Sequence, residues 1–492
     1  MLDLALVRSE PARVQAALGR RGVPPDAVET VVDLDRRWSA RHEMRETLRT
    51  RRRQISREVD RRRAGADAVA RPADAGPDLV RVGRDVARDL KAVDHAMADL
   101  ASRRQAALLA LPNLPATDVP LAPPAVEAAG PPWRRPFPPL AHWDLLEMLH
   151  MAEPAGASAG RGFLLWRGEG ARLVRGLIAF LLDAHTADHG RDEVRAPPLA
   201  TRGALTGSAH LPTLEGMLVE VVDPSRDRSL TLAAGAGAEE KRGGSPHPPR
   251  EADLYLSPRA EPHLAALYAN TVVAEPDLPV RLVAAGTAFR RDSRGGGAAG
   301  RGLLRLRAFP TVEVYTLCRP AESDAELDAA VADAEGLLGR LGLACRRRVR
   351  AATNLSHAAA RTVSLDVWCP GLPERGAEPP FEPGAADGLP ASAPRHSASF
   401  EAPQPERSGD PSGQWVEVAA LSSFTDYQAR RVGARYRDAA GRVRHVHTVG
   451  GASVALPRLI AALIETGQEA DGSVRLPPAL AGHVGLEVLG AP

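Results

Sequence analysis

Two long runs of helical spacing near the N-terminus constrain the fold more than any other feature of the sequence. From Val31 to Val59, nine positions step by three and four residues, and six of the nine are apolar. A break rich in Pro, Gly and Ala follows at residues 71–77, and a second periodic run extends from Val82 to Leu111. This pattern is typical of the apolar seam between two packed helices. The short break predicts an antiparallel helical hairpin that projects from the body as an arm.

The first of these helices is strongly basic. Between Asp35 and Ala64 twelve arginines stand against five acidic residues, although the net charge of the whole chain is only +2. A helix of about 30 residues is roughly 45 Å long, which suits the phosphate backbone of an RNA helix. A solvated helix face and a coiled coil used for dimerisation are the two alternatives that the charge pattern alone leaves open.

Composition favours a cytoplasmic protein without a membrane span. The sequence has no uninterrupted apolar run of about 18 residues, the length that a membrane helix needs. Its three cysteines, Cys318, Cys345 and Cys369, are far apart and form no CxxC pair, which fits a reducing compartment. The first residues do not resemble a secretory or organellar leader. Because a leader can be trimmed, an organelle stays an alternative.

The chain divides into segments of different composition. The arm is predicted over residues 1–112, a Pro-rich linker over 113–140, and a mixed helical and β-type body over 141–492. Two stretches of the body, about 234–252 and 374–413, are rich in Gly, Pro, Ser, Ala and charged residues. They have few side chains able to pack, and we interpret them as surface insertions.

Three stretches of the body carry residues suited to chemistry on phosphates. One runs from Leu254 to Glu261. The second, residues 289–313, reads as a strand–loop–strand hairpin with Arg290 and Arg305 at its ends, followed by Phe309 and Glu313. The third, residues 451–465, predicts a helix whose start presents an arginine. Arginine makes fork-like contacts with phosphate, an aromatic ring can stack on a base, and a carboxylate can bind an ammonium group or a metal.

Several motifs resemble the seryl-tRNA synthetase family of class II aminoacyl-tRNA synthetases. They are LPNLP at 111–115, His142-Trp143, LYLSPRAE at 254–261, Glu417 followed by TDYQARR at 425–431, and His447-Thr448 leading to Arg458. The resemblance covers the chain apart from the two insertions. It implies an α+β fold, in which an antiparallel β-sheet flanked by helices carries an N-terminal antiparallel coiled-coil arm. It also implies that the arm binds tRNA(Ser), which favours RNA over the other interpretations of the basic helix.

The resemblance further implies roles for individual residues. Arg290, Arg458 and Glu417 would be catalytic, and Glu417 would hold Mg²⁺. ATP would contact Arg290, Arg291, Asp292, Arg305, Phe309, Glu417, Val418, Ala419, Ala420 and Arg458. Serine would contact Arg259, Ala260, Glu261, Arg290, Glu313 and Ala452, with its ammonium group on Glu313. Pro197-Pro198 would lie at a homodimer interface. The implied reaction is ATP-dependent activation of serine and its transfer to tRNA(Ser).

The sequence departs from the family pattern mainly around the amino acid. Arg259 replaces a threonine, Asp292 a glutamate, and Ala419 and Ala420 replace two serines, the second of which helps to hold the metal. The Asn-Gly-Ser of the third motif reads Gly450, Gly451 and Ala452. These changes predict intact ATP binding and weakened serine binding, unless Ser257 or Ser453 substitutes. Two alternatives follow: a catalytically impaired paralogue acting as an RNA-binding or regulatory protein, and an enzyme that adenylates another small acid.

The second insertion yields the first testable prediction. Removing residues 378–412 should leave the melting temperature almost unchanged, because that stretch has too few apolar residues to contribute to a core. Differential scanning fluorimetry of the full chain and the deletion variant measures this. A large drop in melting temperature would show that the stretch packs against the body.

Overall fold

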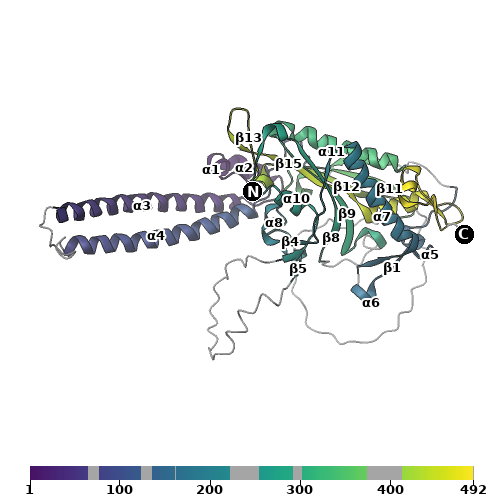
Figure 1. The fold of residues 1–492 in the computed structure, drawn as a ribbon, viewed down its shortest axis with the longest axis horizontal. Helices are drawn as coiled ribbons and strands as arrows, with labels where there is room; N and C mark the ends of the chain where they lie inside the picture. The colour runs from purple at the N-terminus through teal and green to yellow at the C-terminus, as the bar shows by residue number, and fades with distance from the viewer. Residues whose placement is uncertain are drawn as a thin grey trace, which may run out of the picture.

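A computed structural model of the chain describes residues 1–64, 77–122, 136–160, 162–221, 254–291, 302–373 and 413–490. The chain begins with two short helices, α1 (Leu4–Ser9) and α2 (Pro11–Gly19). Two long helices follow, α3 (Pro25–Ala64) and α4 (Pro77–Ala110), and they lie side by side as an arm that projects from the body (Figure 1). The predicted helical hairpin is therefore confirmed.

The packing of the arm is tightest at its base. In α4, the apolar residues of the predicted run from Val86 to Leu100 are buried, whereas Val82 and most of the seam of α3 beyond Leu34 are only half-buried or exposed. At the base, the buried Asp35 accepts hydrogen bonds from Arg8 Nε of α1 at 2.7 Å and from Arg104 Nη1 of α4 at 2.7 Å. The hydrogen bond from Arg8 is the main cause that lowers the pKa of Asp35. Arg104 also lies 4.6 Å above the ring of Trp38. One carboxylate thus connects three helices.

The arm is anchored to the body by two arginines that follow α2. Arg21 donates four hydrogen bonds to the backbone carbonyls of Asn113, Ala359, Leu355 and Ser356, at 2.7–3.1 Å. Arg20 donates to the carbonyl of Ala116 at 3.0 Å. These carbonyls are strong acceptors that would otherwise need water, so a buried guanidinium with several donors is well suited to them.

A seven-stranded sheet forms the centre of the body. Its strands run in the order β10-β11-β12-β15-β9-β8-β3, and all neighbours are antiparallel except β3 and β8. Their bounds are β3 (Asp192–Glu193), β8 (Val280–Phe289), β9 (Ala308–Cys318), β10 (Cys345–Val349), β11 (Arg361–Cys369), β12 (Gln414–Thr425) and β15 (His447–Ala455). The predicted hairpin around residues 289–313 is the β8–β9 pair, and Phe289 lies opposite Ala308 where it opens.

The two faces of this sheet have different functions, as β9 shows. Val312, Val314 and Cys318 belong to the main core, which α7 (Gly168–Asp183), α11 (Ser323–Arg340) and α13 (Leu456–Gly467) cover. Glu313 and Tyr315 face the other way, toward α8 (Arg202–Gly207), α10 (Glu261–Ala266) and α12 (Tyr427–Val432). Because side chains alternate along a strand, β9 builds the core with one face and a cavity with the other.

Smaller elements complete the body. They are α5 (His142–Met148), β1 (Ala152–Pro154), α6 (Gly156–Ala159), β2 (Leu164–Trp166), η2 (Ala184–Asp188), β4 (Leu199–Thr201), η3 (Glu215–Met217), β5 (Val219–Val221), β6 (Leu254–Leu256), β7 (Val272–Ala274), η5 (Glu275–Asp277), η7 (Gly302–Leu304), η8 (Pro320–Glu322), η9 (Ala352–Asn354), β13 (Arg435–Arg437), β14 (Val443–His445), β16 (Val474–Arg475), α14 (Pro478–Val484) and β17 (Val488–Leu489).

The predicted insertions lie outside the described residues, apart from Gly413 at the end of the second. The predicted linker begins against the body, because the Asn113 side chain donates to the carbonyls of Ala358 at 2.9 Å and Phe424 at 2.8 Å. No helix within the described part of the chain is long and apolar enough to cross a membrane.

The anchoring contacts of Arg21 generate a second prediction. Replacing Arg21 by Met should leave four backbone carbonyls, three of them partly buried, without this donor and loosen α1 and α2 from the body. We expect a loss of about 2–4 kcal/mol of stability, seen as a lower melting temperature and faster hydrogen exchange in residues 4–19. Arg13→Met is the control, because Arg13 pairs only with Glu10 on the surface. Equal effects of the two substitutions would contradict the anchoring role.

Candidate functional site

A cavity of about 360 Å³ lies against the face of the sheet opposite the main core. Eleven of the residues that the sequence singled out line it: Arg259, Glu261, Arg290, Phe309, Glu313, Glu417, Val418, Ala419, Ala420, Ala452 and Arg458. Arg291, Arg305 and Ala260 do not line it; Arg291 is exposed, and Ala260 is buried behind the wall. Asp292 lies outside the described residues. Segments nearly 200 residues apart thus converge on one site.

The strand register explains why distant residues meet here. Ala420 of β12 lies opposite Ala452 of β15, and Ala452 lies opposite Glu313 of β9. The three positions form one row across the sheet, with neighbouring side chains about 5 Å apart. Small side chains at two of the three positions leave room above the sheet. The row therefore sets both the width of the cavity and the place of its buried carboxylate.

One end of the cavity carries two arginines and an aromatic ring. Arg290 donates from Nε to the carbonyl of Leu306 at 2.8 Å, and its guanidinium lies 5.0 Å from the centre of the Phe309 ring. Arg458, in the first turn of α13, donates to the backbone carbonyl of Glu417 at 2.9 Å. The N-terminus of a helix favours anions, and the 12-residue α13 presents that end to the cavity. This end is suited to a nucleotide with its phosphates.

Glu417 has basic neighbours that the sequence motifs did not identify. Arg350 of the loop after β10 contacts its carboxylate, and Arg348 lies 3.6 Å from it. Enzymes that use Mg²⁺ with nucleotides hold it by one or two carboxylates together with phosphate oxygens and water. Glu417 supplies one carboxylate, whereas Ala420 supplies no donor. Glu417 therefore fits a Mg²⁺ ion that would take most of its ligands from ATP and water and would compete with Arg350 for this carboxylate.

The other end of the cavity holds two buried carboxyl groups. Burial raises the pKa of Glu261 to about 7, although Arg259 and a hydrogen bond from Gln428 act in the opposite direction. Burial also raises the pKa of Glu313, whose carboxylate accepts the backbone N–H of Glu261 at 2.9 Å. Two carboxyl groups in one dry pocket resist ionising together, so a cationic group placed between them is stabilised. This end is suited to an ammonium group.

The amide of Gln428 fixes the position of Glu261. Its nitrogen donates to Glu261 Oε1 at 2.7 Å and to the carbonyl of Ser208 at 3.0 Å. Its oxygen accepts from the hydroxyls of Tyr315 at 3.0 Å and Thr448 at 3.1 Å. All of these groups are buried. A side-chain amide offers two donors and two acceptor positions, and every one is used here.

The structure also bears on the hydroxyl groups of the pocket. Ser257 and Ser453 do not line the cavity: Ser257 Oγ lies 3.2 Å from His263 Nε2, and Ser453 Oγ lies 2.7 Å from His185 Nε2 on the other side of β15. Neither replaces the serine lost at position 452. The lining residues that the sequence did not indicate include Ser208, His210, Thr311, Arg350, Thr362 and Ser422. Thr311 lies within the stretch 289–313. The others are brought in by strands and loops without a local pattern of their own, so no short motif could have identified them.

Family models match both parts of the chain. Residues 1–115 match the seryl-tRNA synthetase N-terminal domain, and residues 247–467 match the tRNA synthetase class II core domain (G, H, P, S and T). Together with the antiparallel sheet and its cavity, these matches define a class II aminoacyl-tRNA synthetase fold and confirm the predicted fold class.

Relatives of known name are similar over the full length. A serine–tRNA ligase of Pelotomaculum thermopropionicum is 32% identical, over 99% of both chains. One of Gemmatimonas aurantiaca is also 32% identical, over 99% of this chain and 100% of the relative. The crystal structure of seryl-tRNA synthetase from Pyrococcus horikoshii complexed with ATP superimposes with a TM-score of 0.77 at 25% identity, covering 99% of both chains. The chain belongs to the seryl-tRNA synthetase family, and the resemblance seen in its motifs is confirmed.

The raised pKa of Glu261 generates a third prediction. Because its folded-state pKa of about 7 lies above its ordinary value of 4.5, its contribution to stability is full below about pH 4.5 and is lost as the pH rises through about 7. The loss corresponds to at most about 3 kcal/mol. Glu261→Gln removes the titration and keeps an oxygen for Gln428. The variant should melt close to the unmodified protein at pH 5 and several degrees above it at pH 8.

Thermal melts of both proteins across this pH range measure the difference. Glu220→Gln, on the surface strand β5, serves as the control and should follow the unmodified protein at every pH. A constant difference between Glu261→Gln and the unmodified protein would mean that Glu261 does not titrate in this window.

Proposed function

We propose that this chain activates serine with ATP and transfers the seryl group to tRNA(Ser). One observation carries the proposal: a single cavity has Arg290, Phe309 and Arg458 at one end and Glu261 and Glu313 at the other. The first end has the chemistry to bind ATP and the second the chemistry to bind an amino acid. Membership of the seryl-tRNA synthetase family supports serine as that amino acid.

At the nucleotide end, positive charge would meet the phosphates. Arg290 would hold the α-phosphate, and Arg458 with the N-terminus of α13 would hold the outer phosphates. Phe309 would stack on the adenine. Glu417 and the phosphates would hold Mg²⁺, which would supply positive charge where negative charge builds up. The guanidinium of Arg290 is already held in place by its hydrogen bond to the backbone carbonyl of Leu306. Preorganised charge of this kind is an efficient way to stabilise a transition state.

At the amino-acid end, Glu313 and Glu261 would receive the ammonium group of serine. Its carboxylate would then point toward Arg290. A carboxylate oxygen attacks the α-phosphorus, the bond from that phosphorus to the bridging oxygen breaks, and pyrophosphate leaves with its electron pair. A hydroxyl of the terminal ribose of the tRNA next attacks the seryl carbonyl, and AMP leaves. The main contributions of the chain are positioning and neutralisation of charge.

The arm supports tRNA as the second substrate. Arg49, Arg52, Arg53 and Arg57 line a shallow groove on α3. This helix projects from the body as part of the arm (Figure 1). A homodimer is the second part of this proposal. Pro197 and Pro198 are exposed beside the edge strand β3, where a second copy could cover them.

The proposal places this enzyme in the cytoplasm, where ATP, serine and tRNA are available together.

The fourth prediction concerns Arg259, which lines the amino-acid end and offsets the negative charge of Glu261 and Glu313. The unmodified protein should catalyse serine-dependent exchange of pyrophosphate into ATP, but with a high KM for serine. Arg259→Thr should lower that KM about tenfold, because the pocket then gains about 1.4 kcal/mol of attraction for an ammonium group. Adding Ala452→Ser should lower it further, since both positions border one small space.

Arg175→Thr is the control, because Arg175 lies exposed on α7 away from the cavity. Ala420→Ser acts beside Glu417 and should raise kcat more than it lowers the KM for serine. The proposed function would be contradicted if the unmodified protein showed no serine-dependent exchange and the double substitution Arg259→Thr with Ala452→Ser did not restore it.

The fifth prediction concerns the arm. Replacing Arg52, Arg53 and Arg57 by Gln should weaken tRNA(Ser) binding and make it less dependent on salt. The slope of the logarithm of the binding constant against the logarithm of the salt concentration should become shallower by up to about one unit for each phosphate contact that is lost. The control replaces Arg81, Arg88 and Arg103 of α4 by Gln; each of these already pairs with an aspartate of its own helix. Filter binding at several salt concentrations measures both. If both triple variants bound tRNA(Ser) equally weakly, the groove on α3 would not be the specific binding site for the RNA.

A further inference from the structure

Two histidines follow the end of α7 on the face of the sheet that lies away from the cavity. The chain passes there into the π-helical turn η2 (Ala184–Asp188), which carries His185 and is followed by His189. Their Nδ1 atoms lie 3.1 Å apart, and the ring centres are separated by 5.2 Å. Two histidines four residues apart on one helical face are a common pair of metal ligands, and π-helical turns often occur at functional sites.

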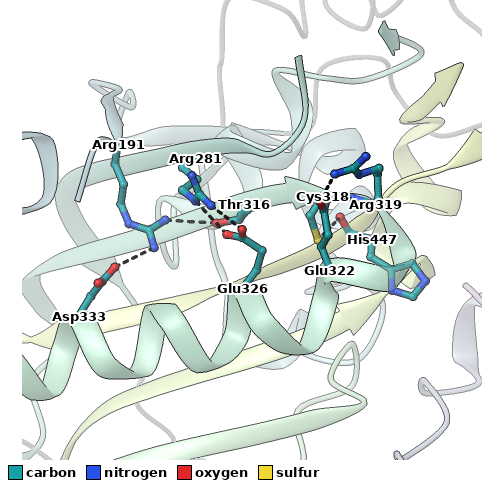
Figure 2. Close-up of polar contacts among 9 residues, drawn as sticks. All are labelled: Arg191, Arg281, Thr316, Cys318, Arg319, Glu322, Glu326, Asp333 and His447. Carbon is teal, nitrogen blue, oxygen red and sulfur yellow. Dashed lines mark hydrogen bonds and ion pairs between the residues drawn. The ribbon is translucent and has the colours of Figure 1, made fainter. Parts of the chain in front are cut away.

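A carboxylate from another helix completes the group. Asp333 of α11 places Oδ1 at 3.7 Å from His189 Nε2. Its other oxygen, Oδ2, accepts a hydrogen bond from Arg191 Nη2 at 3.2 Å. Figure 2 shows Arg191 reaching down to Asp333 while its other nitrogen lies toward Thr316 of β9, 3.2 Å away. One carboxylate oxygen is therefore held by Arg191, and the other lies toward His189.

The orientation of His185 leaves one nitrogen toward this group. Its ring is buried, and Nε2 lies 2.7 Å from the hydroxyl of Ser453. This contact fixes the ring and directs Nδ1 at His189. A metal-binding histidine commonly has its second nitrogen held in this way by a neighbouring group.

We propose that His185, His189 and Asp333 bind a divalent transition-metal ion, with zinc as the best match. One donor atom from each residue can be chosen so that all three lie within 4.8 Å of one another. Donors around a tetrahedral zinc at 2.0–2.1 Å are about 3.3 Å apart. His189 uses Nδ1 toward His185 and Nε2 toward Asp333, so the site closes when one nitrogen of His189 turns to serve both neighbours. A mixed set of two imidazoles and one carboxylate is typical of zinc.

The surroundings define the character of the site. His189 and Asp333 keep about a fifth of their side-chain surface exposed, 20% and 22%. This exposure gives the ion a path from solvent and leaves room for water as a fourth ligand. The guanidinium of Arg191 opposes a second positive charge nearby, so binding is weaker than at a structural site with four protein ligands. An ion here would join η2 to α11 and fix Ser453, the residue after Ala452 of the cavity.

Zinc binding by the full-length chain, without an affinity tag and without ATP, tests this proposal. Equilibrium dialysis with metal analysis should find one zinc per chain that His189→Gln removes and that Asp333→Asn binds at least tenfold more weakly. His483→Gln is the matched control, because His483 also lies 3.2 Å from an aspartate, Asp183, without a third ligand. The zinc content of His483→Gln should equal that of the unmodified protein. Glu417→Gln should also keep its zinc, which would show that the ion does not bind in the cavity.

Two further readouts keep the test independent of folding. Zinc should raise the melting temperature of the unmodified protein and of His483→Gln but not that of His189→Gln, whose circular dichroism must match. Cobalt bound in place of zinc should give the visible absorption of a tetrahedral site. Zinc binding that His189→Gln leaves unchanged, or that Glu417→Gln abolishes, would overturn the proposal, and so would the absence of any bound zinc.

Discussion

The four hydrogen bonds of the Gln428 amide are the constraint on which the rest of the site depends. They join α12 to β9, β15, α10 and the end of α8, in a place from which water is excluded. A buried amide left partly unpaired is costly, so each partner must be in place for the others to be stable. The network therefore fixes Glu261 beside Glu313 and sets the floor of the cavity.

A second theme is that the acidic groups of the cavity already have basic neighbours within the chain. Arg350 and Arg348 lie against Glu417, and Arg259 lies close enough to Glu261 and Glu313 to offset their charge. A metal at the first place and an ammonium group at the second must compete with these arginines. On the proposed function, this competition would weaken the binding of serine.

Much of the fold could be predicted because several elements follow from the spacing of apolar residues within a single segment. The seam of α4, the β8–β9 hairpin and the start of α13 each follow from spacing within one segment. The motifs also found eleven residues of the cavity. Arg350 and His210 could not be found in this way, because they enter the site through long-range packing and carry no local pattern. Gln428 lay within a motif, yet its role depends on Tyr315 and Thr448, which only the sheet register brings to it.

The central claim is that one cavity holds ATP and serine together, and binding of a non-hydrolysable sulfamoyl analogue of seryl-adenylate tests it most directly. The analogue reaches both ends of the cavity at once, so calorimetry should show it bound at least 100-fold more tightly than AMP, the range typical of ligands that mimic a reaction intermediate. Arg290→Ala and Glu313→Gln should each remove most of this gain. An analogue that binds no more tightly than AMP would contradict the account, because the amino-acid end of the cavity would then contribute nothing.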